Sequence, residues 1–152
     1  FLAPRRLPRS MHPLFNSHAL AWLGVAIAAI AFAATWACWR KMGKSWRMGI
    51  DPNEHTQLIV TGPYAYVRHP IYALSSLLML ATVAIIPSPL ILLVALAHLA
   101  LLQWEARREE KHLLNQHGTT YAAYYTQVGR FIPRSLHPYQ PGRPSTQSPT
   151  PK

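Results

Sequence analysis

The chain has 152 residues, of which half are apolar and 13% are charged, and its formal net charge is +10. An average soluble domain has about 25% charged residues, so this composition disfavours an ordinary soluble protein. The length allows one domain or one small membrane bundle. A single cysteine, Cys38, excludes a disulfide within this sequence and a zinc site built from several cysteines.

The Lys and Arg residues flank apolar segments. Nucleic acid binding needs basic residues on a soluble face with aromatic residues among them, so no nucleic-acid partner is expected. Lys and Arg collect on the cytoplasmic side of membranes and interact with anionic lipid. The charge pattern therefore predicts a membrane protein. The remaining basic residues, particularly those in the tail, are interpreted as solvated surface charge.

The first predicted elements are an irregular Pro- and Arg-rich segment, 1–16, and an apolar helix. The uncharged run from Ser17 to Trp39 is long enough to cross a bilayer core of about 30 Å, with Ser17 as its N-cap. Because the sequence opens with Phe1 instead of Met, we expect that N-terminal transmembrane helices can be missing from it.

A polar connector, 40–69, follows. Its Gly and Pro residues argue against a long helix. Within it, 57–61 is a short apolar run that is expected to be extended. Two apolar runs, 70–86 and 89–104, are separated by Pro87-Ser88-Pro89. Each run is roughly 24–26 Å long as a helix, and prolines favour helix boundaries, so a helical hairpin is predicted.

The second arm is expected to continue as an amphipathic helix to about Gln116, with Gly118 as its C-cap and a further short helix over 121–128. The fold class is then an all-α integral membrane protein. It has about three transmembrane helices, including the hairpin, and a cytosolic amphipathic helix. We expect a membrane domain over 1–134, with its motifs in 40–134, and a disordered Pro-rich tail over 135–152. Three spans place the segments 40–69 and 105–134 on one side, taken as cytoplasmic.

Arg68-His69-Pro70 is the first candidate for chemistry. Proline favours the first turn of a helix, which makes His69 the cap and turns open N–H groups toward the polar loop. Together with Arg68, that helix end suits an anion such as a carboxylate. The alternative is that Arg68 reaches lipid phosphate and His69 only caps the helix.

Two further groups accompany this segment. Tyr64, Tyr66 and Tyr72 suit an aromatic ring or a cation, or equally an interfacial aromatic belt. Glu105, Glu109 and His112 share a helix face, next to Glu110, and suit an amine or ribose hydroxyls. The alternative for these acids is salt bridging with neighbouring Lys and Arg on a solvated helix.

His98 lies inside the second apolar arm, where an ionisable group is a functional candidate by default. A neutral histidine bonded to a neighbouring helix is the favoured interpretation. The histidines show no metal-ligand spacing, so no metal is expected. The sequence also has no P-loop and no dinucleotide-binding glycine motif.

The segment that runs from Thr61-Gly62-Pro63-Tyr64 through Arg68-His69-Pro70 to Ile71-Tyr72 resembles the signature of the isoprenylcysteine carboxyl methyltransferase family, to which the phospholipid N-methyltransferases are related. The second half of that signature is also present. It consists of Glu109-Glu110, then Leu113, Leu114, Gly118, Tyr121 and Tyr124, then Val128-Gly129-Arg130-Phe131-Ile132-Pro133. Upstream, Gly43-Lys44-Ser45-Trp46 is similar to another element of the family. The resemblance covers about 20–134.

The resemblance implies an integral membrane enzyme that uses S-adenosylmethionine, with its site at the cytoplasmic surface, in a bacterial inner membrane. The cofactor contacts that it implies are Tyr64, His69, Pro70, Tyr72, Glu109 and Glu110. The catalytic residues that it implies are Arg68, Glu109 and Arg130. One departure is Leu74, where the family often has Gly, and Ser75 and Ser76 can supply small side chains instead.

The expected acceptor is a lipophilic or small molecule, such as a prenylated or small thiol compound, a carboxylate or a lipid amine, and it enters laterally between helices. Two other classes remain open. Membrane sterol and steroid reductases share a similar C-terminal module and bind NADPH, but this sequence shows no additional basic pocket for a 2′-phosphate. A membrane scaffold would not need the Arg-His-Pro segment and the Glu pair together. Oligomeric state is not predicted.

Overall fold

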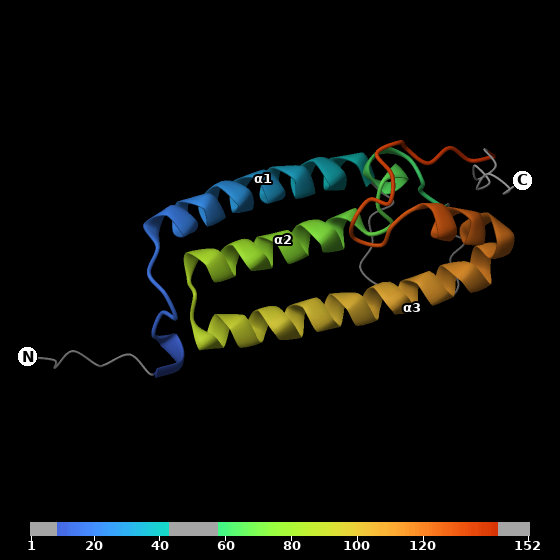
Figure 1. Cartoon of the computed structure of the whole chain (residues 1–152). Helices are drawn as coiled ribbons and strands as arrows, with labels where there is room; N and C mark the ends of the chain where they lie inside the picture. The colour runs from blue at the N-terminus through green and yellow to red at the C-terminus, as the bar shows by residue number, and fades with distance from the viewer. Residues whose placement is uncertain (1–8, 43–57, 143–152) are drawn as a thin grey trace, which may run out of the picture. The chain divides into compact units, whose positions relative to one another are not determined.

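The computed structural model describes residues 9–42 and 58–142. It contains three α-helices, α1 (His18–Met42), α2 (Pro70–Ile85) and α3 (Pro89–Gln127), and two short 3-10 helices, η1 (Arg9–Met11) and η3 (Gly62–Ala65) (Figure 1). The described residues form no named strand, which confirms the all-α class. The predicted element Gly43-Lys44-Ser45-Trp46 and the segments 1–8 and 143–152 lie outside the described residues.

The chain divides into two compact units. The first unit comprises residues 1–43 and 71–105, and so holds α1, nearly all of α2 and the first part of α3. The second unit comprises residues 44–70 and 106–152. The Arg-His-Pro segment and the paired glutamates both belong to the second unit.

In the first unit, α1 has one buried face of small residues. Gly24, Ala31, Thr35 and Cys38 are buried and recur at intervals of seven, four and three, which places them on one side of a helix. The other side exposes bulky residues, including Trp22, of which 72% is exposed. The predicted cap at Ser17 is confirmed, because the backbone N–H of Leu20 donates to its hydroxyl at 3.3 Å.

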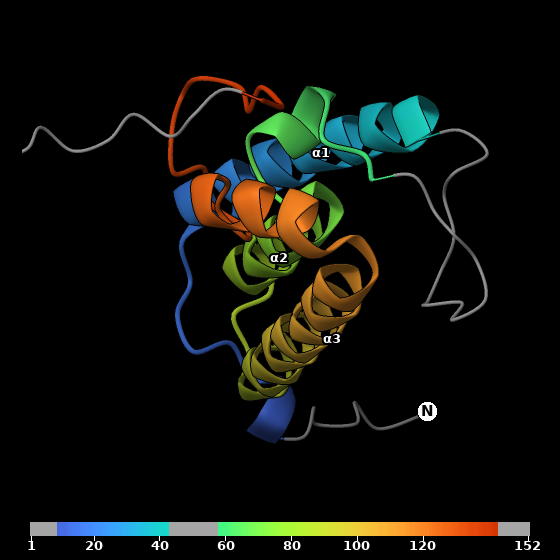
Figure 2. The same cartoon turned by 90° about the vertical axis from the view of Figure 1, so that its right-hand side faces the viewer.

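The helical hairpin is also confirmed. Helix α2 ends at Ile85, and α3 begins at Pro89 after a buried turn at Pro87 and Ser88. The Ser88 hydroxyl accepts from the N–H of Ile91 at 3.3 Å and so caps α3. Figure 2 shows α1, α2 and the first part of α3 as neighbouring rods.

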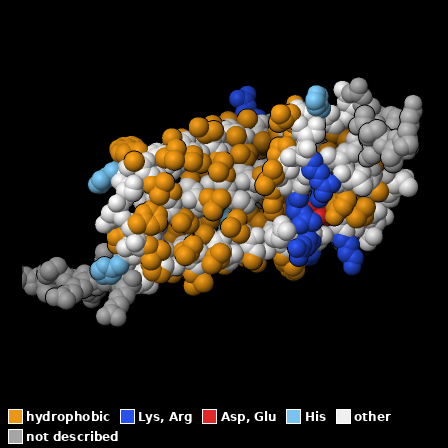
Figure 3. Space-filling model, viewed as in Figure 1, with side chains coloured by type: hydrophobic (Ala, Val, Ile, Leu, Met, Phe, Trp, Pro, Cys, Tyr) orange, Lys and Arg blue, Asp and Glu red, His pale blue; other side chains and the backbone are white. Residues whose placement is uncertain are grey.

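The apolar helices keep most of their surface exposed. Helices α1 and α3 each contain an apolar window long enough to cross a membrane, of mean hydropathy 2.0 and 1.7, yet only 17% and 11% of those windows is buried. The core helix of a soluble protein would be mostly buried, whereas lipid-facing helices need not be. Helix α2 is also apolar but shorter, with 16 residues. Apolar side chains cover much of the visible face of this unit in Figure 3.

Helix α3 bends at Gly118, which has φ 52° and ψ −125°. A residue with a Cβ rarely adopts this conformation, so the glycine ends one helical segment and lets the next begin. The second segment continues to Gln127. The predicted end of the amphipathic helix at Gly118 and the short helix that follows it are thus both found.

Candidate active site

A pair of backbone hydrogen bonds builds the site in the second unit. The N–H of Arg68 donates to the carbonyl of Gly129 at 2.8 Å, and the N–H of His69 donates to the carbonyl of Arg130 at 3.0 Å. Val67 and Gly129 form an isolated parallel bridge. The residues just before α2 are therefore fixed beside the segment that follows α3.

A tyrosine cluster supports this arrangement. Tyr121, Tyr124 and Val128 are almost completely buried, and they recur at intervals of three and four after the bend at Gly118. The hydroxyl of Tyr124 donates to the carbonyl of Tyr64 at 2.6 Å. Burial of the Tyr124 phenol raises its pKa, so it stays protonated and remains a donor at neutral pH.

Arg68 and Glu110 form a buried ion pair at the centre of the site. Their side chains are 3% and 4% exposed, and Nε and Nη2 of Arg68 donate to Oε1 of Glu110 at 3.1 and 2.8 Å. Nη1 donates to the carbonyls of Tyr125, at 2.9 Å, and Val128. The guanidinium also lies 4.2 Å from the ring centroid of Tyr125, a cation–π distance.

Arg130 binds the same carboxylate from the C-terminal side. Its Nε donates to Oε1 of Glu110 at 2.9 Å and its Nη2 donates to Oε2 at 2.5 Å. This bidentate geometry is the strongest kind of arginine–carboxylate contact. Unlike Arg68, Arg130 keeps 21% of its side chain exposed.

His69 lies between the two glutamates. Its Nδ1 is 3.3 Å from Oε2 of Glu109 and its Nε2 is 3.3 Å from Oε1 of Glu110. Burial disfavours the charged ring, but the two carboxylates outweigh burial and raise the pKa of His69. A neutral imidazole has one N–H, so only the protonated ring can donate to both acids.

The cluster fixes its own charge state. Burial alone would raise the pKa of Glu110, but contacts with His69, Arg130 and Arg68 outweigh it and hold that pKa well below the usual range. The five side chains, the two acids included, carry a net charge of +1 when His69 is protonated and zero when it is neutral. The side chain of Glu109 is 26% exposed, so solvent or a ligand can reach it.

The structure brings together the Arg-His-Pro segment and the Glu pair, as the sequence predicts. Each of the three nitrogens of Arg68 donates to a protein acceptor, and 97% of its side chain is buried. The expectation that this helix end binds a ligand anion stays a prediction. Tyr72 and Glu105 belong to the first unit.

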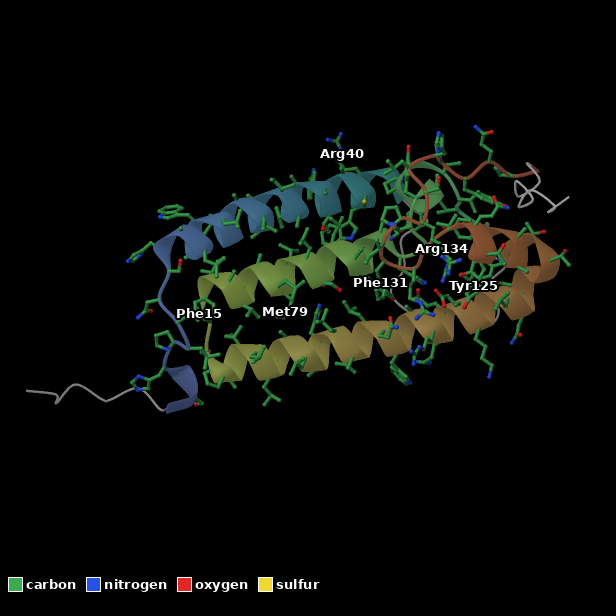
Figure 4. All side chains as sticks on the ribbon, viewed as in Figure 1. Phe15, Arg40, Met79, Tyr125, Phe131 and Arg134 are labelled. Atoms are coloured by element: carbon green, nitrogen blue, oxygen red, sulfur yellow. The ribbon has the colours of Figure 1, made fainter. Side chains whose placement is uncertain are left out.

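Two other residues of this unit, Tyr125 and Phe131, were not assigned to the site from the sequence. Tyr125 contacts Arg68 through both its carbonyl and its ring. The ring centroid of Phe131 is 6.2 Å from that of His69 in an edge-on arrangement. Figure 4 labels Tyr125 on α3 and Phe131 in the segment after it. The spacing Tyr121, Tyr124, Tyr125 marks one helix face and could have indicated the cluster.

Tyr139 lies after residue 135, where the sequence predicts a disordered tail, and it contacts two residues of the second unit. Its N–H donates to the carbonyl of Ala65 at 2.9 Å, and its ring meets that of Tyr124 edge-on at 5.1 Å between centroids. These contacts lie within the predicted tail, 135–152, whose disorder stays a prediction. Residues 143–152 lie outside the described residues.

Comparison with protein families finds a match to phospholipid methyltransferase over residues 19–120, about two thirds of the chain. Comparison with curated proteins and with solved structures finds no match. The matched region includes α1, the hairpin, the Arg-His-Pro segment and both glutamates. This chain therefore belongs to the phospholipid methyltransferase family and is a membrane methyltransferase.

Proposed function

We propose that this protein transfers a methyl group from S-adenosylmethionine to a lipophilic acceptor, and that the cofactor binds at the cluster of His69, Glu109 and Arg130. The observation that carries the proposal is the clustering of two acids with three basic side chains at the N-terminal end of an apolar helix. The family match supports the reaction class.

The exposed side chains of the cluster fit the polar groups of the cofactor. S-adenosylmethionine carries an amine, a carboxylate and ribose hydroxyls. Glu109 suits the amine or the hydroxyls, and Arg130 suits the carboxylate, because both remain partly exposed. When bound, the cofactor supplies an electrophilic methyl group that an acceptor nucleophile takes by direct displacement.

The buried members of the cluster have a different role in this proposal. Arg68 and Glu110 are positioning residues, because their hydrogen bonds join the segment before α2 to α3 and to the segment after it. His69 contacts both glutamates and holds the carboxylate of Glu109 in place. Orientation of two reactants can supply a large part of the rate of a displacement, so no dedicated base is required.

The acceptor is proposed to be a membrane lipid or a lipid-like molecule. The family match favours a phospholipid amine, whereas the sequence motif resembles that of enzymes for isoprenylcysteine carboxylates. Both substrates have an apolar part that apolar helices can receive from the bilayer. We place the site at the cytoplasmic surface of a bacterial inner membrane, with 1–134 as the membrane domain and an acceptor that enters laterally.

The test is ligand binding to the detergent-purified protein by calorimetry, with S-adenosylmethionine, its demethylated product and NADPH as separate ligands. We expect the first two to bind and NADPH not to bind. Glu109→Gln should weaken cofactor binding by about ten- to a hundredfold, because a hydrogen bond to a charged group contributes about 1.5–3 kcal/mol.

The matched control is Lys111→Gln, which changes an exposed charge two residues along the same helix. It should leave the affinity unchanged. Binding of NADPH without S-adenosylmethionine would overturn the methyl-transfer proposal in favour of a reductase. Equal affinities of Glu109→Gln and the unaltered protein would remove Glu109 from the site.

A further inference from the structure

We propose that residues 131–137, called here the interfacial loop, bind the surface of an anionic membrane. Ile132 and Leu136 enter the lipid interface, and Arg134 contacts lipid phosphate. The inference is independent of the methyl-transfer proposal, because it concerns a surface outside the ion cluster.

The first observation is exposure. Ile132 is 78% exposed and Leu136 is 89% exposed. Among the other large apolar residues described in the second unit, the most exposed is Tyr66, at 39%. Exposed single apolar residues are normal on soluble surfaces. Two aliphatic residues this exposed, four positions apart around an arginine, resemble the pattern of a segment that lies in a membrane interface.

The second observation is that the interfacial loop is held at both ends. Before it, Gly129 and Arg130 accept backbone hydrogen bonds from Arg68 and His69, and after it the N–H of Tyr139 donates to the carbonyl of Ala65. A Cβ on Gly129 would lie 1.9 Å from the carbonyl oxygen of Ile132, so the turn into the loop is tight and requires glycine. The loop therefore presents its apolar side chains from a fixed base.

The third observation is the position of that base. The N–H of His69, the residue before α2, donates to Arg130 at 3.0 Å. Helix α2 is mostly apolar and carries no charged residue, and with 16 residues it is about 24 Å long. Its first residue, Pro70, directly follows Arg68 and His69, so the uncharged helix begins at the edge of the charged cluster. Ile132 is only two residues from Arg130, at most about 7 Å of chain.

The fourth observation is charge. All acidic residues of the chain lie at or before Glu110, so 111–142 has none, while it contains Lys111, Arg130 and Arg134. Arg134 is exposed, and its Nη1 donates to the carbonyl of Thr126 at 2.6 Å. Each Lys or Arg near an anionic membrane surface contributes about 1 kcal/mol of attraction.

The test uses the full chain in liposomes, without cofactor or acceptor. Cysteine is introduced at Ile132 or Leu136 in a Cys38→Ala background and labelled with a fluorophore, and quenching by lipids with nitroxides at known depths is measured. Thr119→Cys, exposed at the bend of α3, is the matched control. We expect labels at 132 and 136 to be quenched at least threefold more than the label at 119 by nitroxides near the lipid headgroups.

Liposomes with about one third anionic lipid are compared with neutral ones. Quenching at position 132 should be stronger with anionic lipid, and Arg134→Gln should remove most of that difference. Labels at 132 and 136 that are no better quenched than the label at 119 would overturn the proposal. Labels that are shielded from both water and lipid would also overturn the proposal, because that result indicates that a second copy of the chain covers the loop.

Discussion

At the residue scale, Glu110 joins three segments that are distant in the sequence. Its carboxylate binds Arg68 before α2 and Arg130 after α3, and it is 97% buried as a residue. A buried ion pair adds little net stability over an apolar pair, but removal of one partner leaves an uncompensated charge. Loss of Glu110 should therefore destabilise the second unit by about 3–5 kcal/mol, which makes Glu109 the better position for binding experiments.

The protonation of His69 predicts how stability depends on pH. Its pKa is raised in the folded state, so its contribution is complete below the unfolded value of about 6.5 and is lost as pH rises through the folded pKa. Above about pH 6.5, the thermal unfolding temperature of the unaltered protein in detergent should therefore fall with rising pH. His69→Gln should reduce that slope.

The other shifted groups of the cluster do not interfere with this measurement. The pKa of Glu110 is lowered, so its contribution is lost only in acid, below its ordinary value. The pKa values of Tyr121 and Tyr124 are raised, so these phenols titrate only in strong base. Equal slopes for His69→Gln and the unaltered protein would show that the ring does not couple to Glu109 and Glu110.

The sequence indicated most of these residues but not how they are paired. Arg68, His69, Glu109 and Glu110 stand out because charged residues beside apolar helices are few. Arg68 donates to Glu110 and to two carbonyls through contacts between residues that are 42 to 60 positions apart. Such contacts leave no local pattern, so the acceptors of Arg68 could not be predicted from the sequence.

At the scale of elements, local patterns predict the helices well. The length of the uncharged run predicts α1, the two prolines predict the hairpin, and Gly118 predicts the bend in α3. These features act through backbone geometry or through length and are visible in a few consecutive residues. The bridge between Val67 and Gly129 joins single residues far apart, and nothing in either segment alone predicts it.

The sequence predicts that His98 bonds to a neighbouring helix, but not which residue it meets. Oγ of Ser75 lies 3.1 Å from Nε2 of His98, so the histidine bonds to a neighbouring helix, as the favoured interpretation of the sequence has it. Ser76 donates instead to the carbonyl of Tyr72 in its own helix, at 2.8 Å. Hydrogen bonds between membrane helices contribute about 0.6 kcal/mol on average, so this pair is expected to add little to stability.

Gly118 allows a test of the bend. Gly118→Ala adds a Cβ that meets no atom within 4 Å, so any loss comes from the backbone conformation alone. A strained conformation of this kind costs about 1–3 kcal/mol, and we expect the unfolding temperature to fall accordingly. Thr119→Ala, the exposed neighbour, is the control and should have little effect. An unchanged unfolding temperature for Gly118→Ala would mean that the bend is not required.

At the scale of the whole molecule, the two units have different sources of stability. The first unit exposes apolar helix surface, and its buried face on α1 is made of small residues. The second unit buries tyrosines and an ion cluster, and it uses backbone bonds between segments. Composition predicted the first unit because membrane helices follow from length and hydropathy. It could not predict the second, whose core is assembled from three separate segments.

The contribution of the C-terminal residues to stability can be measured with two shortened proteins, one that ends at Gly142 and one that ends at Ser135. The first loses only 143–152, a polar Pro-rich stretch that lacks the apolar content to bury a core, and should unfold like the full chain. The second loses Tyr139. With it go the hydrogen bond to Ala65, worth about 0.5–1.5 kcal/mol, and the edge-on contact with Tyr124, worth a similar amount.

The protein that ends at Ser135 should therefore be less stable by about 1–3 kcal/mol, as measured by thermal unfolding in detergent. Tyr139→Phe in the full chain is a matched control, because it keeps the ring and the backbone N–H and should retain the stability. Tyr139→Ala keeps only the backbone N–H and should give an intermediate loss. Two shortened proteins of equal stability would show that the contacts of Tyr139 do not stabilise the protein.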